Sequence, residues 1–397
     1  MKWTNKGHEI DEYVKASAFM RNGQKKYYIF GAGFYGKELL QILREYEFTA
    51  VFIDNNVEKQ NSKIEGVDVI SLDHFLKKKD GIIVIAASEG NRLEIVEQLE
   101  SKSLKHGVDF WLYEEFANCI LPIIFTYLFD KVYIPIAQIT LTERCSLKCK
   151  KCAHGCFAVD NKLAIDLTLL QVCKSADAFF SKVDNVYEFV LIGGEPLLYR
   201  ELDQVICYIG EKYRGHMGVY SITTNGTIIP EETVLKACKK YNVLFRISNY
   251  SGQIPRLKNT YQKLTSILEQ YDIAYILGKE ENTWMDYGFD YLDRKTNEEE
   301  LIKVFDACKT PCREIRENKL YYCVMARSVS DNLGYHVGMN DYLDLDKLEG
   351  ENYKKELLEF TLGYSEKGYL DMCNYCHGKD AINYPVPAAE QIVGKVL

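Results

Sequence analysis

The sequence predicts an α/β protein in which strands and helices alternate along the chain. Short apolar runs of strand type, such as 26–30, 189–192 and 243–247, are followed by stretches with helical periodicity. Polar or glycine-rich clusters come directly after several of these runs, as in folds that build their sites at the carboxyl ends of parallel strands. The chain also carries 13 cysteines, several of them at ligand-like spacing, which indicates that metal chemistry is added to this framework.

The composition describes a globular chain of more than one domain. With 397 residues, of which 47% are apolar, we expect roughly two or three domains with real cores. The formal charge is −8, from 49 basic and 57 acidic residues, and there is no long basic run, so no nucleic-acid partner is expected. The N-terminus is too polar for a secretory signal, and the longest apolar stretch, Cys119 to Phe129, is too short to span a bilayer. These features predict a reduced, cytoplasmic protein without a membrane span.

The N-terminal part is predicted to be a polar tail at 1–24 followed by a βαβ domain at 25–115. The first strand candidate runs into Gly31-Ala32-Gly33-Phe34-Tyr35-Gly36, a G-x-G-x-x-G turn, and the second ends at Asp54. This pattern resembles the small Rossmann-like domains that precede catalytic domains in bacterial sugar-modifying proteins. Two readings stay open, cofactor binding on one side and docking or structural use on the other. We favour docking or structural use because the unit is only half of a full dinucleotide-binding fold. Residues 116–134 are expected to form an apolar linker.

The stretch 138–156 carries a cysteine loop after a strand candidate. Cys145, Cys149 and Cys152 have the spacing C-x3-C-x2-C. Three thiolates leave one corner of a [4Fe–4S] cluster open for another ligand, whereas a structural zinc ion is closed by four ligands. Cys156 could supply a fourth sulfur, so a zinc site is the alternative at this point.

Two further motifs follow the next strand candidates in order. Gly193-Gly194-Glu195-Pro196 comes after 189–192, and Thr223-Thr224-Asn225-Gly226 comes after 219–222. Together with the three-cysteine loop before them, these motifs resemble the radical S-adenosylmethionine (radical SAM) enzymes. A zinc loop would have no reason to be followed by the other two motifs.

This resemblance implies a partial (β/α)6 TIM barrel, the radical SAM core, over residues 135–300. It implies that Cys145, Cys149 and Cys152 hold a catalytic [4Fe–4S] cluster, which cleaves S-adenosylmethionine (SAM) to methionine and a 5′-deoxyadenosyl radical. The SAM contacts that it implies are Glu195 for the methionine ammonium, the backbone of Gly193 and Gly194 beside it, and Thr223, Thr224, Asn225 and Ser248 for the ribose or the carboxylate. One departure from the family is Lys151, which stands where many members carry an aromatic residue near the adenine.

The C-terminal segment, 301–397, carries a second set of cysteines. It resembles the twitch-type auxiliary domain, a shortened SPASM domain that holds one extra [4Fe–4S] cluster. The resemblance implies the ligands Cys308, Cys323, Cys373 and Cys376. Cys308 is favoured over Cys312 because nine residues separate it from Asn318, which stands where the family's turn glycine usually does and tolerates a left-handed backbone. A structural zinc site is the alternative here as well.

These resemblances lead to a functional hypothesis. We expect a radical SAM oxidoreductase or epimerase that acts on a carbohydrate- or polyol-like substrate and takes electrons from a donor such as flavodoxin or ferredoxin. A peptide-modifying SPASM-type maturase is one alternative, although no winged peptide-recognition module is found. A non-catalytic iron–sulfur scaffold is the other, although a scaffold would not need the SAM motifs. The residue that acts on the substrate is not assigned; candidates for substrate contacts are Arg246, Tyr250, Arg256, Arg313 and His336.

Overall fold

The computed structural model describes residues 11–392 except 18–19, 21–25, 281–282 and 337. The chain divides into two compact units, residues 5–133 and a second unit built on residues 134–397. Most of the predicted tail, 1–24, lies outside the described residues. Within it, α1 (Asp11–Ala16) is helical.

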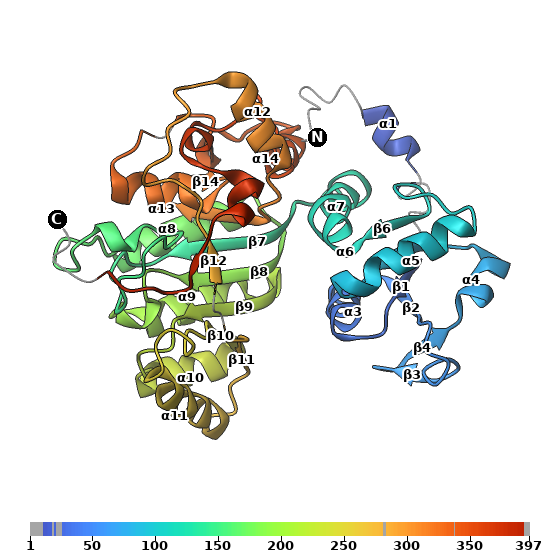
Figure 1. Ribbon diagram of the computed structural model, residues 1–397, viewed down its shortest axis with the longest axis horizontal. Helices are drawn as coiled ribbons and strands as arrows, with labels where there is room; N and C mark the ends of the chain where they lie inside the picture. Colours follow the sequence, from blue (N-terminus) through green and yellow to red (C-terminus); the bar gives the residue numbers. More distant parts are fainter. Residues whose placement is uncertain (1–10, 18–19, 21–25, 281–282, 337, 393–397) are drawn as a thin grey trace. The chain divides into compact units, whose positions relative to one another are not determined.

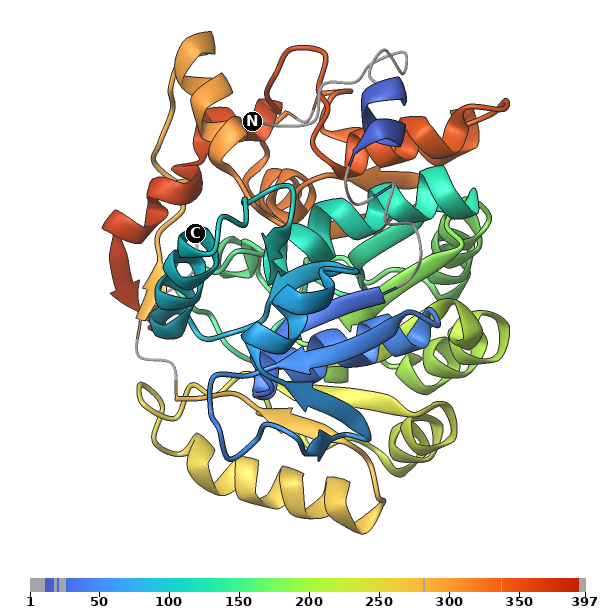
Figure 2. The same cartoon turned by 90° about the vertical axis from the view of Figure 1, so that its right-hand side faces the viewer.

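The N-terminal unit is a six-stranded sheet with the order β3-β4-β2-β1-β5-β6. The strands β4, β2, β1, β5 and β6 pair in parallel, and only β3 runs antiparallel to its neighbour. Figure 2 shows the blue strands of this sheet running side by side. The strands are β1 (Lys26–Phe30), β2 (Thr49–Ile53), β3 (Lys63–Ile64), β4 (Val67–Ile70), β5 (Ile82–Ile85) and β6 (Phe110–Leu112).

Helices cover both faces of this sheet because successive strand residues point to opposite faces. On one face, Tyr28 and Phe30 pack with residues of α4 (Leu72–Lys78) and α5 (Glu89–Ser101). On the other face lies α3 (Phe34–Glu45), whose Gly36 passes close to the carbonyl of Gly31. A Cβ atom at Gly36 would come within 1.9 Å of that carbonyl oxygen, so the last glycine of the turn is required by helix–strand packing.

The segment predicted as a linker, 116–134, is helical as far as Phe129, and its residues 116–133 belong to the N-terminal unit. It contains a π-helical turn, η2 (Phe116–Ile120), between α6 (Tyr113–Glu115) and α7 (Leu121–Phe129). Phe116 contacts Tyr27 edge-on at 5.1 Å, and Phe125 contacts Tyr46 at 4.7 Å. The apolar character that suggested packing between domains is therefore used inside one unit.

The second unit is organised around an eight-stranded sheet with the order β11-β10-β9-β8-β7-β13-β14-β15. The pairs β8–β9, β9–β10, β10–β11 and β7–β13 are parallel, whereas β13–β14 and β14–β15 are antiparallel. In Figure 1 these strands are green and yellow in the core and orange in the C-terminal part. They are β7 (Tyr133–Thr140), β8 (Asn185–Ile192), β9 (Met217–Thr224), β10 (Val243–Ile247), β11 (Tyr275–Leu277), β13 (Cys312–Arg316), β14 (Lys319–Tyr321) and β15 (Tyr342–Asp344).

Helices follow the strands of this sheet. Thr168 and Gln171 form a reciprocal capping box at the start of α8, which fixes where this helix begins. The helices are α8 (Leu169–Phe180), α9 (Leu202–Tyr213), α10 (Glu232–Tyr241), α11 (Leu257–Gln270), α12 (Glu298–Ala307), α13 (Val324–Leu333) and α14 (Tyr353–Thr361). The short 3-10 helices are η3 (Cys156–Ala158), η4 (Pro196–Leu198), η5 (Arg214–His216), η6 (Leu345–Lys347), η7 (Asp371–Tyr375) and η8 (Gly378–Asn383). The predicted α/β class with parallel sheets is confirmed.

Three details of the second unit differ from the sequence predictions. The strand that would continue the parallel series after β11, β12 (Thr283–Met285), instead pairs antiparallel with β16 (Pro385–Pro387) in a separate two-stranded sheet. The C-terminal segment also does not stand apart, because β13 joins the sheet beside β7. The hairpin between β13 and β14 places its left-handed residue at Glu317, with φ 53°, and not at Asn318 as the turn pattern predicted.

Candidate functional site

The cysteine loop begins directly after β7 and is packed into the protein. Cys145 and Cys149 are buried, and Cys152 is half-buried beside them. Cys156 is also buried and belongs to the same apolar cluster, together with Leu147 and Ala389. Three sequence-predicted ligands and the fourth candidate sulfur are thus brought together in one place.

Burial disfavours the thiolate form at Cys145, Cys149 and Cys156, whereas the thiolate of Cys152 is favoured. Burial raises the pKa of Cys145 to about 12 and that of Cys149 to about 12. A hydrogen bond from the Cys156 thiol lowers the pKa of Cys152, and the same contact raises the pKa of Cys156. Since metal-bound cysteines are thiolates, occupation of this loop has to release protons, and the positive charge of the metal replaces the missing solvation.

The donor set fits an iron–sulfur cluster by its chemistry. The three thiols share one buried loop, and each bond to a cluster iron would be formed by a sulfur that has no disulfide partner. Within the described part of the chain, no three His, Cys, Asp or Glu side chains are set closely enough to hold one metal ion. A [4Fe–4S] cluster places its thiolates on different irons and leaves the fourth iron to another ligand.

The Gly193-Gly194 segment after β8 lies directly against the cysteine loop. The Gly194 N–H donates to the Thr142 carbonyl at 2.7 Å, and the Glu195 N–H donates to the Arg144 carbonyl at 2.8 Å. A Cβ atom on Gly194 would lie 2.3 Å from the Arg144 oxygen and 2.9 Å from the Cys145 Cβ. The absence of a side chain here is what lets the two loops approach, so this glycine shapes the cysteine loop itself.

Glu195 is fully buried, with its carboxylate held by the two neighbouring loops. One oxygen accepts from the Leu197 N–H at 3.1 Å and from the Thr224 hydroxyl at 2.7 Å, and the other accepts from the Asn225 N–H at 2.9 Å. Burial nevertheless raises the pKa of Glu195 to about 7. The side chain therefore joins the loop after β8 to the loop after β9. Its predicted contact with the methionine ammonium of SAM stays a prediction.

The loop after β9 brings Asn225 to the first cysteine. The Asn225 Nδ2 lies 3.6 Å from the Cys145 Sγ and 3.1 Å from the Ser146 hydroxyl. Thr224 is buried on Glu195, whereas Thr223 is half-buried. Ser248 follows β10 and donates its backbone N–H to the Thr224 carbonyl at 2.9 Å. The predicted SAM-contact residues thus gather at the carboxyl ends of adjacent strands.

Lys151, which departs from the family pattern, forms ion pairs with two aspartates. Its ammonium lies 2.5 Å from Asp290 and 3.2 Å from Asp286, and it stands 4.4 Å from the centre of the Tyr291 ring. These partners belong to the segment after β12. The lysine therefore ties the cysteine loop to that segment. In this position its side chain is not placed to contact an adenine.

The second set of cysteines forms another buried group. Cys323, Cys373 and Cys376 are buried, and Cys308 is half-buried at the end of α12. Burial raises the pKa of Cys376 to about 11, with Cys308 adding to the shift, and burial together with Cys308 and Cys376 raises the pKa of Cys323 to about 12. These thiols from separate segments therefore lie close enough to influence one another. Their assignment as cluster ligands stays a prediction.

Cys312, the competing candidate, faces the strand β7. Its thiol donates to the Gln138 Oε1 at 3.2 Å. Burial raises its pKa, and the charge of Glu314 contributes to the same direction. The preference for Cys308 over Cys312 as a ligand is an inference from this placement and from the sequence spacing.

A buried ion pair links the two cysteine groups. Arg327, four residues after Cys323, is fully buried and contacts Glu143 at 2.6 Å and Glu314 at 2.9 Å. Glu143 stands two residues before Cys145. Burial raises the pKa of Glu143, but the Arg327 guanidinium outweighs it and holds that pKa below its ordinary value. The sequence contained no signal for this pair, because its partners are 184 positions apart.

Two of the candidate substrate residues are engaged within the protein. Arg313 is buried, stacks 3.9 Å from the centre of the Tyr322 ring and donates to backbone carbonyls of Thr310 and Tyr322. Arg246 pairs with Glu188, at 2.8 Å for one of the two contacts. Arg313 therefore has a structural role. The Arg246–Glu188 pair joins two strands of the sheet, β10 and β8.

The N-terminal unit has a hollow of about 460 Å³ after β1, β2 and β5, lined in part by Gly33, Asp54 and Lys59. The Asp54 carboxylate accepts from the Ala32 N–H at 3.0 Å, the Asn56 N–H at 2.9 Å and the Lys59 ammonium at 3.0 Å. Burial by itself would raise the pKa of Asp54, but these contacts outweigh it and hold that pKa below its ordinary value. Since a carboxylate offers about four acceptor positions, little remains for a ribose diol. Cofactor binding and docking both stay predictions for this unit.

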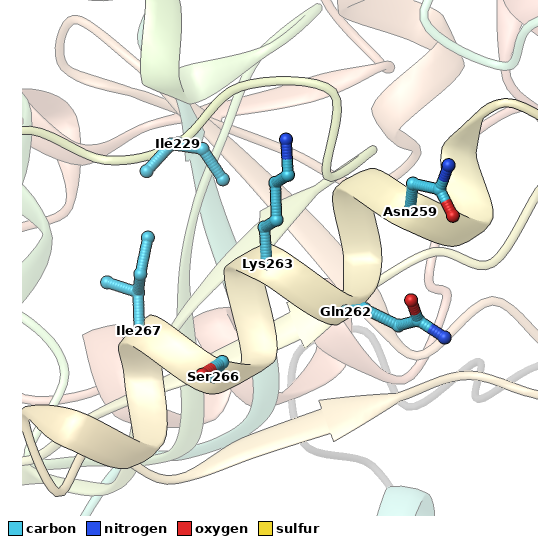
Figure 3. A pocket seen from close by; sticks show the side chains of 6 residues that line it. All are labelled: Ile229, Asn259, Gln262, Lys263, Ser266 and Ile267. Carbon is cyan, nitrogen blue, oxygen red and sulfur yellow. The ribbon is translucent and has the colours of Figure 1, made fainter.

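Another hollow, of about 530 Å³, lies against α11 in the second unit (Figure 3). Its lining comes from one side of this helix and from Ile229, and the helix contributes Asn259, Gln262, Lys263, Ser266 and Ile267. None of the predicted site residues lines it. This hollow is therefore separate from both cysteine groups.

None of the helices that the structure describes combines the length and the apolar character that a membrane crossing needs.

No protein-family model matches the chain. Two curated relatives are GTP 3′,8-cyclases. The one from Stenotrophomonas maltophilia (strain R551-3) is 31% identical over 96 residues, which are 24% of this chain and 28% of the relative. The one from Syntrophomonas wolfei subsp. wolfei is 33% identical over 91 residues, which are 23% of this chain and 27% of the relative. The match thus spans less than a third of each relative's length.

Solved structures give partial matches. BtrN in complex with AdoMet and 2-DOIA has a TM-score of 0.38 at 13% identity and covers 65% of this chain and 97% of its own. Native anSMEcpe with bound AdoMet and Cp18Cys peptide has a TM-score of 0.30 at 15% identity, covering 36% and 42%. Streptococcus suis SuiB bound to S-adenosylmethionine has a TM-score of 0.28 at 17% identity, covering 47% and 44%. All three of these structures contain bound AdoMet or S-adenosylmethionine.

The contact between Gly194 and the cysteine loop predicts the effect of a single methyl group. Gly194→Ala should reduce iron uptake at the first cysteine site, because the added Cβ would push the loop away from Arg144 and Cys145. Gly215→Ala is the matched control, since nothing lies within 4 Å of a Cβ atom there. Iron content and cluster absorbance after anaerobic reconstitution measure the effect. Equal iron uptake by both variants would contradict this role of Gly194.

Proposed function

We propose that this chain is a radical SAM enzyme, which cleaves SAM reductively and uses the resulting radical to take a hydrogen atom from a carbohydrate- or polyol-like substrate. The observation that carries the proposal is the convergence of three motifs. The cysteine loop, Gly194 and Asn225 come from three different strands, and direct contacts join them. A cysteine loop that held only a structural ion would need neither of the other two.

The roles of the chain's own residues follow from this arrangement. Cys145, Cys149 and Cys152 would hold a [4Fe–4S] cluster, which when bound supplies the electron for SAM cleavage. Asn225 donates toward the first of these sulfurs, and Glu195 keeps the loops after β8 and β9 in register with the cysteine loop. The similar solved structures contain bound AdoMet or S-adenosylmethionine, which supports SAM as a cofactor of this site.

The preference for a hydroxylated substrate is supported by a polar group on the sheet. The Ser221 hydroxyl donates to Glu188 at 2.7 Å, and Arg246 pairs with the same carboxylate. On β7, Thr140 is fully buried, and its hydroxyl has no hydrogen-bond partner among the described residues. Carboxylate, guanidinium and hydroxyl groups of this kind match the hydrogen-bonding groups of a sugar or polyol.

The preference for oxidation depends on the second cysteine group. We propose that Cys308, Cys323, Cys373 and Cys376 hold an auxiliary [4Fe–4S] cluster, which when bound can accept the second electron from the substrate. Their mutual influence on thiol pKa supports their grouping. The ion pair of Arg327 with Glu143 and Glu314 would fix the distance between the two groups, because a charge buried this deeply cannot leave its partners without a large desolvation cost.

The first prediction from this proposal tests the catalytic loop. Replacement of Cys145, Cys149 and Cys152 by Ala should abolish formation of 5′-deoxyadenosine from SAM and reductant, while a second cluster stays visible by absorbance. The Cys207→Ala variant is a suitable control, because this cysteine lies in α9 away from both groups. Cleavage of SAM by the triple variant would show that the loop has been misassigned.

The second prediction concerns Glu195 and pH. Since burial places the pKa of Glu195 near 7, the carboxylate is mostly neutral below that pH and charged above it. If it accepts the SAM ammonium, affinity should rise as pH increases through about 7, and Glu195→Gln should flatten this dependence and weaken binding by about 1–3 kcal/mol at high pH. Calorimetry across this range measures both effects. A flat wild-type profile would leave Glu195 only its role in joining the loops.

The third prediction separates an auxiliary cluster from zinc. The reconstituted chain should contain about eight irons, four for each [4Fe–4S] cluster, and no stoichiometric zinc. Cys323→Ala and Cys308→Ala should each lower the iron count by about four while SAM is still cleaved, whereas Cys312→Ala should keep the full count. Metal analysis that finds about four irons and one zinc would exclude the redox role, because zinc transfers no electrons.

A further inference from the structure

The last described residues cross the first cysteine loop as a strap. This C-terminal strap, residues 385–392, begins with β16, which pairs with β12. It then passes through Ala388 and Ala389, both fully buried, to reach the loop. In Figure 1 the red chain end runs beside the green loop.

The strap and the loop are joined by regular backbone hydrogen bonds. The Lys150 N–H donates to the Glu390 carbonyl at 2.7 Å, and the Ile392 N–H donates to the Lys148 carbonyl at 2.8 Å. Cys149 and Gln391 face each other as an antiparallel bridge between these bonds. A cysteine of the first group is thus paired residue by residue with a segment 242 positions away.

The Gln391 side chain reaches the sulfur of that cysteine. Its Oε1 accepts from the Lys148 N–H at 2.8 Å, which fixes the orientation of the amide. Its Nε2 donates to the Ala389 carbonyl at 2.7 Å and to the Cys149 Sγ at 3.1 Å. Both amide hydrogens and the amide oxygen are therefore assigned to partners, and one of these partners is the thiol.

We propose that Gln391 is a positioning residue of the first cluster site, which donates a hydrogen bond to the Cys149 thiolate and raises the reduction potential of the cluster. This inference rests on the proposed function, since it concerns the same cysteine loop. A hydrogen bond to a ligating sulfur stabilises negative charge on it, and the reduced cluster carries one more negative charge than the oxidised cluster. The bond therefore favours the reduced form, the form that SAM cleavage requires.

The surroundings of the contact strengthen its effect. Cys149 is 8% exposed and Ala389 is fully buried, and Trp284 and Tyr250 pack against the same cluster of residues. With water kept away, the amide dipole is poorly screened, so it acts on the sulfur more strongly than it would at the surface. The strap thus supplies both the donor and the apolar cover.

A strap that served packing alone would make the same contacts. Three variants separate packing from the hydrogen bond to the Cys149 sulfur. Gln391→Glu keeps the shape of the side chain and the acceptor for Lys148, but it puts a carboxylate oxygen where the donor to sulfur stands. Gln391→Met keeps the length and removes every polar group. Glu390→Gln is the matched control, because its exposed side chain pairs with Lys150 at 2.6 Å.

The experiment uses the full-length chain reconstituted under anaerobic conditions. Iron content and circular dichroism establish that each variant is folded and loaded, and a redox titration followed by electron paramagnetic resonance gives the potential of the cluster whose signal changes on SAM addition. We expect a more negative potential in Gln391→Glu and in Gln391→Met, and an unchanged potential in Glu390→Gln.

Loaded Gln391 variants with the wild-type potential would overturn the inference and leave the proposed function standing. A wild-type chain that takes up no SAM-responsive cluster would instead contradict the proposed function itself. If Gln391→Met loads poorly, the isosteric Gln391→Glu decides the matter, because it retains the contact with Lys148 that holds the strap in place.

Discussion

The packing of the glycine pair after β8 against the cysteine loop is the constraint on which the rest of the site depends. Gly194 approaches Arg144 and Cys145 so closely that no other residue fits, and its N–H and that of Glu195 hold the loop by two backbone bonds. The Glu195 carboxylate then carries this order to the loop after β9 through Thr224 and the backbone of Asn225. A buried carboxylate with three donors is costly to disturb, so three loops behave as one rigid unit.

Ion pairs hold the cysteine loop both in the protein interior and at its outer part. Arg327 compensates Glu143 and Glu314 in the interior, and it does so between the two cysteine groups. Lys151 fastens the outer part of the loop to Asp286 and Asp290. The loop is thus held by ion pairs in the interior and at its outer part, while the buried thiols of Cys145 and Cys149 keep raised pKa values until a metal takes the place of their protons.

The N-terminal unit carries the glycine turn of a dinucleotide-binding motif, but the acidic residue of that motif is already hydrogen-bonded within the protein. The glycine turn and Asp54 stand in the predicted places, and Gly36 is demanded by packing against Gly31. The carboxylate of Asp54, however, is engaged by the turn's own backbone and by Lys59. The glycine motif therefore predicts the conformation of the turn, whereas ligand binding depends on which hydrogen-bond acceptors of Asp54 are not yet used.

Local pattern alone determined the α/β class, most strand positions and the order of the three motifs, because strand periodicity and ligand spacing are properties of neighbouring residues. Tertiary structure decided what pairs across long separations. It placed residues 116–133 in the N-terminal unit and paired β12 with β16. It also put the left-handed turn residue at Glu317 and brought Gln391 to Cys149. These outcomes depend on burial, on sheet pairing and on which donors lack partners, and none of these is written in the spacing of neighbours. The residues that surround the cysteines therefore became visible only once the chain was folded.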